Sequence, residues 1–212
     1  IKNKVKEIID GKQQKTIPHI IAVTKTFSPN KITPLLEIGH LHFGENKIQE
    51  AENKWLDIKN RYKQVQLHMI GNLQSNKAKK AVQLFDFIHS LDNLKLADVL
   101  RKREIELNKK LSYFIEINIG DESQKSGISP DDAKDFLKYC TKEINLNVIG
   151  LMVIPPNDNN PNKYFEKISK LNSNLGLEHL SMGMSSDYEM AVKFNSTFLR
   201  IGSAILGERN TN

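Results

Sequence analysis

Short apolar segments rich in β-branched residues alternate with longer amphipathic segments along this 212-residue chain. An apolar run of about four to eight residues is typical of a buried strand, and apolar residues at helical spacing indicate a covering helix. The strand candidates are 19–24, 41–44, 65–70, 85–89, 112–119, 147–153, 179–181 and 197–201. The helices expected between them span 29–38, 46–62, 75–84, 93–110, 130–143, 162–175 and 187–194. This alternation predicts a parallel sheet with crossover helices.

Closing eight such units on themselves gives a (β/α)₈ TIM barrel, and we predict this α/β fold as a single domain over residues 1–212. An extra helix over residues 1–11 is expected to precede the first strand, with Val5 and Ile8 on one face. The length is near the lower end for this architecture, so the loops must be short. An open doubly wound sheet is the alternative, but no G-x-G-x-x-G or P-loop pattern supports it.

Two Ser-Pro pairs predict where helices begin. Ser28-Pro29 and Ser129-Pro130 each place a serine at the N-cap and a proline in the first turn. Asp131 and Asp132 follow the second pair and suit the positive end of a helix.

Charge and cysteine content exclude several classes of protein. The formal net charge is +6, but 31 basic residues are interleaved with 25 acidic ones, so we expect a solvated surface and no nucleic-acid partner. Cys140 is the single cysteine, which rules out an internal disulfide and suits a reducing compartment. No apolar window reaches the roughly 18 residues of a membrane span. The expected location is therefore the cytoplasm, with no membrane partner. His40 and His42 share a strand face but lack a third ligand, so no metal site is expected.

Polar residues and glycines gather after the predicted strands, at the end of a barrel where catalytic and binding groups lie. Lys25 directly follows the apolar run 20–23. In an apolar pocket a lysine amine loses its proton more easily and becomes a nucleophile for a Schiff base. The alternative is a lysine that extends from the strand end to solvent.

The loops after strands seven and eight suit a phosphate group. Gly183 permits close backbone approach, and Ser185 and Ser186 offer hydroxyls. Gly202-Ser203 repeats this pattern after the last strand, at the position where barrels often bind phosphate. Ordinary turn glycines are the alternative.

Arg200 and His68 lie within predicted strands and are further candidates for the site. Arg200 is flanked by two apolar residues, so alternation turns it to the opposite face, where an anionic group or a ring nitrogen would be its partner. A salt bridge on the outer surface is the alternative. His68 stands in the third strand, where a packed core histidine is the commoner interpretation.

Seven stretches stand in order between residues 20 and 209: IAVTKTFSP, FGENKIQE, LHMIGNLQSNKAK, IEINIGDESQKSGI, GLMVIPP, LSMGMSSDYEMAV and STFLRIGSAILGER. FGEN-x-x-QE, IG-x-LQSNK and LSMGMS are specific when they occur together. In these stretches the chain resembles the small pyridoxal phosphate homeostasis proteins. The resemblance covers nearly the whole chain. Thr24, Leu67 and Ser203 depart from the usual Ser, Trp and Thr of that family.

The resemblance implies the barrel of alanine racemase-like, fold type III enzymes, with pyridoxal 5′-phosphate as the cofactor. It implies that Lys25 forms the internal aldimine, that Asn46 lines the cofactor ring and that Arg200 faces the pyridine nitrogen. The residues it assigns to the phosphate are Met184, Ser185, Gly202 and Ser203, and we include His68 in the cofactor site. Arginine only donates, so the pyridine nitrogen would stay unprotonated and the cofactor would be a weak electron sink.

The resemblance favours a protein that holds pyridoxal phosphate within the cell, in vitamin B6 homeostasis, with pyridoxal-phosphate-dependent apo-enzymes as candidate recipients. The alternative is a racemase-like enzyme. A racemase needs acid and base groups on both faces of its substrate, and only Lys25 is convincing here. No second, β-rich domain follows the last strand, so we expect a non-enzyme and a monomer. A barrel that binds only protein or RNA has nothing but the basic charge in its favour.

Overall fold

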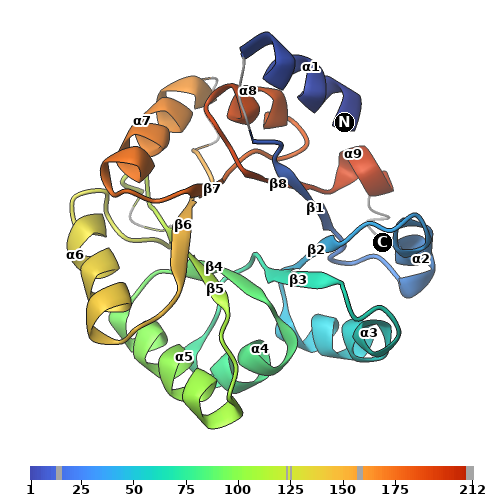
Figure 1. Cartoon of the computed structure of the whole chain (residues 1–212), viewed down its shortest axis with the longest axis horizontal. Coiled ribbons are helices and arrows are strands. Elements are labelled where there is room, and N and C mark those ends of the chain that lie inside the picture. Colours follow the sequence, from blue (N-terminus) through green and yellow to red (C-terminus); the bar gives the residue numbers. More distant parts are fainter. Residues whose placement is uncertain (13–15, 123, 125, 157–159, 209–212) are drawn as a thin grey trace.

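The computed structural model describes residues 1–12, 16–122, 124, 126–156 and 160–208. Eight parallel strands pair in chain order, and β1 pairs with β8 to close the barrel (Figure 1). The strands are β1 (His19–Val23), β2 (His42–Glu45), β3 (Gln66–Met69), β4 (Phe87–Leu91), β5 (Ser112–Glu116), β6 (Val148–Met152), β7 (His179–Ser181) and β8 (Phe198–Ile201). The predicted (β/α)₈ barrel is confirmed, and the open-sheet alternative is wrong.

Helices surround the ring of strands on its outside (Figure 1). They are α1 (Lys2–Lys12), α2 (Pro29–Glu37), α3 (Ile48–Arg61), α4 (Ala78–Leu84), α5 (Leu94–Leu107), α6 (Ala133–Lys138), α7 (Pro161–Asn174), α8 (Tyr188–Lys193) and α9 (Ser203–Leu206). A 3₁₀ turn, Ser75–Lys77, leads into α4, and a π-helical turn, Tyr139–Glu143, follows α6. The predicted N-terminal helix is α1, which packs beside α8 (Figure 1). No helix within the described ranges is long and apolar enough to cross a membrane.

The largest differences from the predicted helices are the late start of α6 and the additional helix α9. The helix expected from Pro130 begins at Ala133, because the Ser129 hydroxyl accepts a hydrogen bond from the Asp132 backbone N–H (3.1 Å) and closes a separate turn. Helix α9 was not predicted, since four residues are too few to show a helical period. Ser28 does stand at the N-cap of α2 with Pro29 after it, but the serine side chain makes no capping bond.

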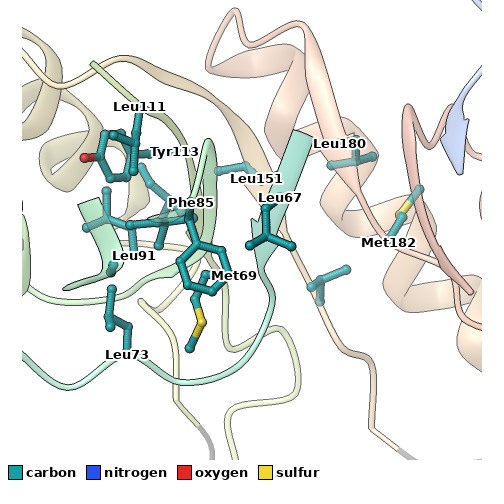
Figure 2. Packing of buried hydrophobic residues seen from close by; sticks show 14 of the residues in the cluster. Leu67, Met69, Leu73, Phe85, Leu91, Leu111, Tyr113, Leu151, Leu180 and Met182 are labelled. Atoms are coloured by element: carbon teal, nitrogen blue, oxygen red, sulfur yellow. The ribbon is translucent and has the colours of Figure 1, made fainter. Parts of the chain in front are cut away.

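The barrel has two layers of buried side chains. The larger layer lies between strands and helices, and Figure 2 shows some of its members: Leu67 and Met69 of β3, Tyr113 of β5, Leu151 of β6 and Leu180 of β7. The smaller layer fills the inside of the barrel and contains Ile21, Phe114, Met152 and Phe198. Neighbouring residues of one strand supply different layers because side chains alternate along a strand. Ala22, for example, belongs to the outer layer and Ile21 to the inner one.

Candidate functional site

A cavity of about 580 Å³ opens where the strands end, at the C-terminal face of the barrel. The residues that line it are Val23, Lys25, Asn46, Ile70, Ile154, Met184, Ser185, Ser186, Arg200, Gly202, Ser203 and Glu208. They come from the ends of β1, β2, β3, β6, β7 and β8 or the loops that follow, so parallel pairing alone brings them together. Its size falls in the range of small-molecule sites, roughly 300 to 1,000 Å³.

Lys25 is held at the mouth of β1 by the backbone on either side of it. The Thr24 N–H donates to the Gly44 carbonyl (2.9 Å), which continues the ladder between β1 and β2 to the last residue before the lysine. Thr26 then takes a left-handed conformation (φ 69°), and its N–H donates to the Glu50 carboxylate. This turn ends the strand and leaves the partly buried Lys25 lining the cavity.

A buried ionic network stands behind that turn. Lys54 of α3 donates to the Thr24 carbonyl (2.8 Å) and to the carboxylates of Glu45 (2.8 Å) and Glu50 (2.9 Å). The Trp55 indole N–H donates to the same Glu45 oxygen at 2.9 Å. Glu45 is fully buried and Lys54 nearly so, and a charge in such a place is stable only when it is paired. The network therefore fixes α3 to the ends of β1 and β2, next to Lys25.

Arg200 enters the cavity from β8, the strand that pairs with β1. Its Nη1 donates to the Ser181 hydroxyl at 2.7 Å, and its Nη2 donates to the Val153 carbonyl at 2.8 Å. Burial lowers the pKa of Arg200 to about 10, while Glu116 and then Asp187 raise it, so the guanidinium stays charged at neutral pH. The surface salt-bridge alternative is wrong, because the side chain is buried and bonded within the barrel.

The loops after β7 and β8 form one unit beside Arg200. The Ser185 hydroxyl accepts hydrogen bonds from the backbone N–H groups of Gly202 and Ala204, both at 3.3 Å. Gly183 has a φ of 94°, and a Cβ there would lie 2.6 Å from the Cβ of Ala191, so no other residue fits without a shift. The two loops predicted to suit phosphate thus lie against each other at the rim of one cavity.

Asn46 contributes an unusual group to the wall. Its side-chain oxygen is buried and accepts no hydrogen bond from the described residues. Its backbone is held close to β3, since a Cβ on Gly71 would lie only 2.3 Å from the Asn46 carbonyl oxygen. A buried polar atom without a partner is costly, so this oxygen indicates a position for a ligand that donates a hydrogen bond.

The sequence model described as alanine racemase, N-terminal domain, matches residues 3–210 of the chain. A curated relative from Aquifex aeolicus, named pyridoxal phosphate homeostasis protein, is 37% identical over 199 residues, which cover 90% of this chain and 86% of the relative. A protein of the same name from Haemophilus influenzae is 36% identical and covers 95% of this chain and 89% of its own length. This chain belongs to the pyridoxal phosphate homeostasis protein family.

Solved structures of two similar proteins agree with the fold. PipY of Synechococcus elongatus with pyridoxal phosphate bound is 30% identical, with a TM-score of 0.82 over 96% of this chain and 100% of PipY. An alanine racemase from Clostridium difficile is 12% identical, with a TM-score of 0.75 over 99% of this chain and 56% of the racemase. That second likeness concerns the barrel alone.

The predicted site residues of this family member converge, with one exception. Those that line the cavity are Lys25, Asn46, Met184, Ser185, Arg200, Gly202 and Ser203. His68 does not line it: its ring lies inside the barrel, bonded to His42 and His89. Since strand alternation turns His68 inward below the cavity floor, its neighbours are other interior rings. Within the described residues, no group of three or more His, Cys, Asp or Glu suits a metal ion.

Several functional contacts escaped the sequence analysis. Ile70, Ile154 and Glu208 line the cavity. Ser181 accepts a hydrogen bond from Arg200, and Lys54 donates one to the Thr24 carbonyl, next to Lys25. Apolar residues at strand ends carry no signal that separates a cavity wall from a core. Glu45 does carry such a signal, because a carboxylate at the end of a buried strand needs a cation as its partner.

Proposed function

We propose that this chain binds pyridoxal 5′-phosphate in the C-terminal cavity, held through Lys25, and acts in pyridoxal phosphate homeostasis. The observation that carries the proposal is that one cavity is lined by the partly buried Lys25 after β1 and the buried Arg200 of β8. The serines of the two loops after β7 and β8 line the same cavity. The PipY structure, a relative whose whole length is covered by this chain, contains pyridoxal phosphate.

The residues present fit this cofactor. Ser185, Ser203 and the adjoining backbone N–H groups suit the phosphate, because hydroxyls and amides donate to its oxygens. Met184 and Gly202 complete that wall. Arg200 would face the pyridine nitrogen as a donor, and the unpartnered Asn46 oxygen would face a donor on the ring. Pyridoxal phosphate supplies a reactive aldehyde and, when its nitrogen is protonated, an electron sink.

Lys25 would hold the cofactor covalently. Its Nζ condenses with the aldehyde carbon, one C=N bond forms, and the carbonyl oxygen leaves as water. The ionic network of Glu45, Lys54 and Glu50 fixes the backbone on both sides of Lys25. The Lys25 amine is therefore held at one position in the cavity. The apolar side chains of Val23 and Ile70 limit the water around it.

We propose a carrier and not a racemase. No tyrosine is found among the described residues that line the cavity, and Tyr188, the one nearest in sequence to the phosphate loop, directs its hydroxyl toward Glu189 at 3.4 Å. A guanidinium donor at the pyridine nitrogen also weakens carbanion stabilisation. The candidate recipients are pyridoxal-phosphate-dependent apo-enzymes. One chain supplies both Lys25 and Arg200, which supports a monomer, and the single cysteine suits the cytoplasm.

The test is the visible absorption spectrum with added pyridoxal phosphate, for wild type, Lys25→Ala and Lys47→Ala. Lys47 is the matched control, because it is an exposed lysine beside Asn46 that does not line the cavity. Borohydride reduction followed by peptide mass analysis then locates the adduct. We expect one adduct, on Lys25, and loss of the band in Lys25→Ala alone. Adducts scattered over surface lysines would refute the site.

Racemase activity is tested on the same preparations. We expect no exchange of the α-proton when holoprotein is incubated in deuterated water with each common amino acid. Exchange that is lost in Lys25→Ala would show an enzyme and overturn the carrier proposal.

A further inference from the structure

A continuous hydrogen-bonded chain of side chains runs through the inside of the barrel. The His42 Nδ1 lies 3.0 Å from the His68 Nε2, and the His68 Nδ1 lies 2.9 Å from the His89 Nε2. The His89 Nδ1 lies 2.9 Å from the Ser181 hydroxyl, which is the group that Arg200 contacts. We call His42, His68, His89 and Ser181 the interior relay.

The interior relay joins the two ends of the barrel. Arg200 lines the C-terminal cavity, whereas His42 is the first residue of β2 and lines a second cavity of about 490 Å³ at the N-terminal end. Between them, His68 and His89 are fully buried, and their rings stack on Phe87 and Phe114 at centroid distances of 4.3 Å each.

The chemistry of arginine determines where each hydrogen of the relay lies. A guanidinium only donates, so the Ser181 oxygen accepts from Arg200. The remaining partner of that buried hydroxyl among the described residues is the His89 Nδ1, so the hydroxyl donates to it. His89 then carries its hydrogen on Nε2 and donates to the His68 Nδ1.

The same reasoning continues to the other end. Since the His68 Nδ1 accepts, its hydrogen lies on Nε2 and is donated to the His42 Nδ1. The reverse order would leave the Ser181 hydroxyl with no acceptor. Burial supports uncharged rings, because it lowers the pKa of His68 and His89 far below the ordinary value.

We propose that the interior relay orients Arg200 for cofactor binding, with Ser181 and His89 as positioning residues and all three imidazoles in the neutral Nε2–H form. The inference rests on the proposed function for its effect on pyridoxal phosphate, but not for the tautomers. A guanidinium with two fixed contacts keeps its remaining N–H groups directed into the cavity. His68, although remote from the cavity, therefore influences what happens there.

The first test needs no variant and no cofactor. Long-range ¹H–¹⁵N spectra of the histidine rings at pH 7.5 distinguish the two neutral tautomers. We expect the Nε2–H form at His42, His68 and His89 in wild type. The Nδ1–H form, or a charged ring, at His68 or His89 would overturn the relay.

The second test compares two buried serines that differ in their contacts. Ser181→Ala removes the hydroxyl between Arg200 and His89, whereas Ser90→Ala removes a buried hydroxyl that has no partner among the described residues. We expect Ser181→Ala to weaken pyridoxal phosphate binding by about tenfold, the effect of losing one charge-assisted hydrogen bond. It should also release His89 from a single tautomer. Ser90→Ala should change neither.

The outcomes separate this inference from the proposed function. If wild type forms no adduct on Lys25, the proposed function fails, while the tautomers still decide the relay. If wild type forms the adduct but Ser181→Ala binds as wild type does, the relay does not position Arg200. Should Ser181→Ala fail to fold, His89→Leu tests the same step, because leucine offers no acceptor to the Ser181 hydroxyl. Unchanged binding in a folded His89→Leu would contradict the proposal.

Discussion

At the scale of single residues, the buried carboxylate of Glu45 lies next to the turn that carries Lys25. One oxygen of Glu45 accepts hydrogen bonds from Thr24 (2.7 Å), Lys54 (2.8 Å) and Trp55 (2.9 Å). A fully buried carboxylate needs such donors, because burial removes its hydration. The position of Lys25 therefore depends on the hydrogen bonds of the Glu45 carboxylate, although Glu45 does not line the cavity.

Lys54→Met tests this coupling. The substitution keeps an unbranched side chain but leaves the Glu45 charge buried without its cation. We expect the free energy of unfolding to fall by about 3–5 kcal/mol, measured by urea denaturation. The yield of the Lys25 adduct should fall as well, because the Thr24 carbonyl loses its ammonium donor.

Lys80→Met is the matched control. Lys80 forms an ion pair of similar length with Glu52 (2.7 Å), but its side chain is 46% exposed. Exposed pairs contribute about 0–1 kcal/mol, so this variant should stay close to wild type in both measurements. If the two variants lost the same free energy of unfolding, burial would not be the reason why the Lys54 ion pairs contribute to stability.

At the scale of elements, the helices show that an N-cap residue type does not guarantee an N-cap bond. Asn93 precedes α5, and its side-chain oxygen accepts from the Leu96 N–H at 2.8 Å. Ser28 occupies the same place before α2, where its side chain makes no such bond. The difference lies in side-chain orientation, which residue type alone does not specify.

Asn93→Ala and Ser28→Ala form a matched pair for this point. Asn93→Ala should lower the free energy of unfolding by about 1 kcal/mol, the usual contribution of a cap. Ser28→Ala should change it by less than about 0.5 kcal/mol, as expected for a surface position. Both are read from urea midpoints at constant denaturant slope. A loss at Ser28 equal to that at Asn93 would contradict the cap geometry.

At the scale of the whole molecule, the barrel disfavours protonated histidines, two of which, His68 and His89, are fully buried. All six histidines have a lowered pKa, with burial as the main cause, and His42 falls to about 4. The groups facing His42 are themselves basic: His19 from β1, and His40, whose ring donates to the His42 carbonyl (2.9 Å), while Lys2 and Lys6 line the same cavity. Protonation inside the barrel is therefore unfavourable.

This predicts a stability that falls with pH below about 6.5. In the unfolded chain the histidines gain protons through that pH, while in the folded barrel His42 gains one only near pH 4. The unfolded state thus binds more protons over this window, and stability is lost as pH falls. We expect urea unfolding free energies to drop by at least about 1.4 kcal/mol per pH unit between pH 6 and 5, one net proton or more.

One acidic group opposes this trend and supplies a control. Burial, then Asp92, raises the pKa of Glu116 to about 7, so the folded state holds this proton more tightly than the unfolded one. Its contribution is present below about pH 4.5 and is lost as pH rises through 7. Glu116→Gln should therefore make the dependence between pH 5 and 6 steeper. A flatter dependence in this variant would show that the folded state does not hold the Glu116 proton more tightly than the unfolded state.

Apolar periodicity and the residues that follow each strand were enough to predict the barrel and most of the residues that line its cavity. Apolar runs such as 20–23 predicted strands because a strand buried on both faces must be apolar throughout. Parallel strands in chain order bring the residues after each strand to one face. The sequence alone therefore predicts that Lys25, Arg200 and Ser185 lie close together. The family stretches added a prediction of which of these polar residues would contact a cofactor.

The contacts that each polar side chain makes depend on how the folded barrel packs. We predicted His68 among the cofactor residues, but its ring points into the barrel and bonds to His42 and His89 in the interior relay. The pairing of Glu45 with Lys54 and of Arg200 with Ser181 joins residues 9 and 19 positions apart. Such contacts follow from barrel closure and side-chain packing in three dimensions, which periodicity along one strand does not encode.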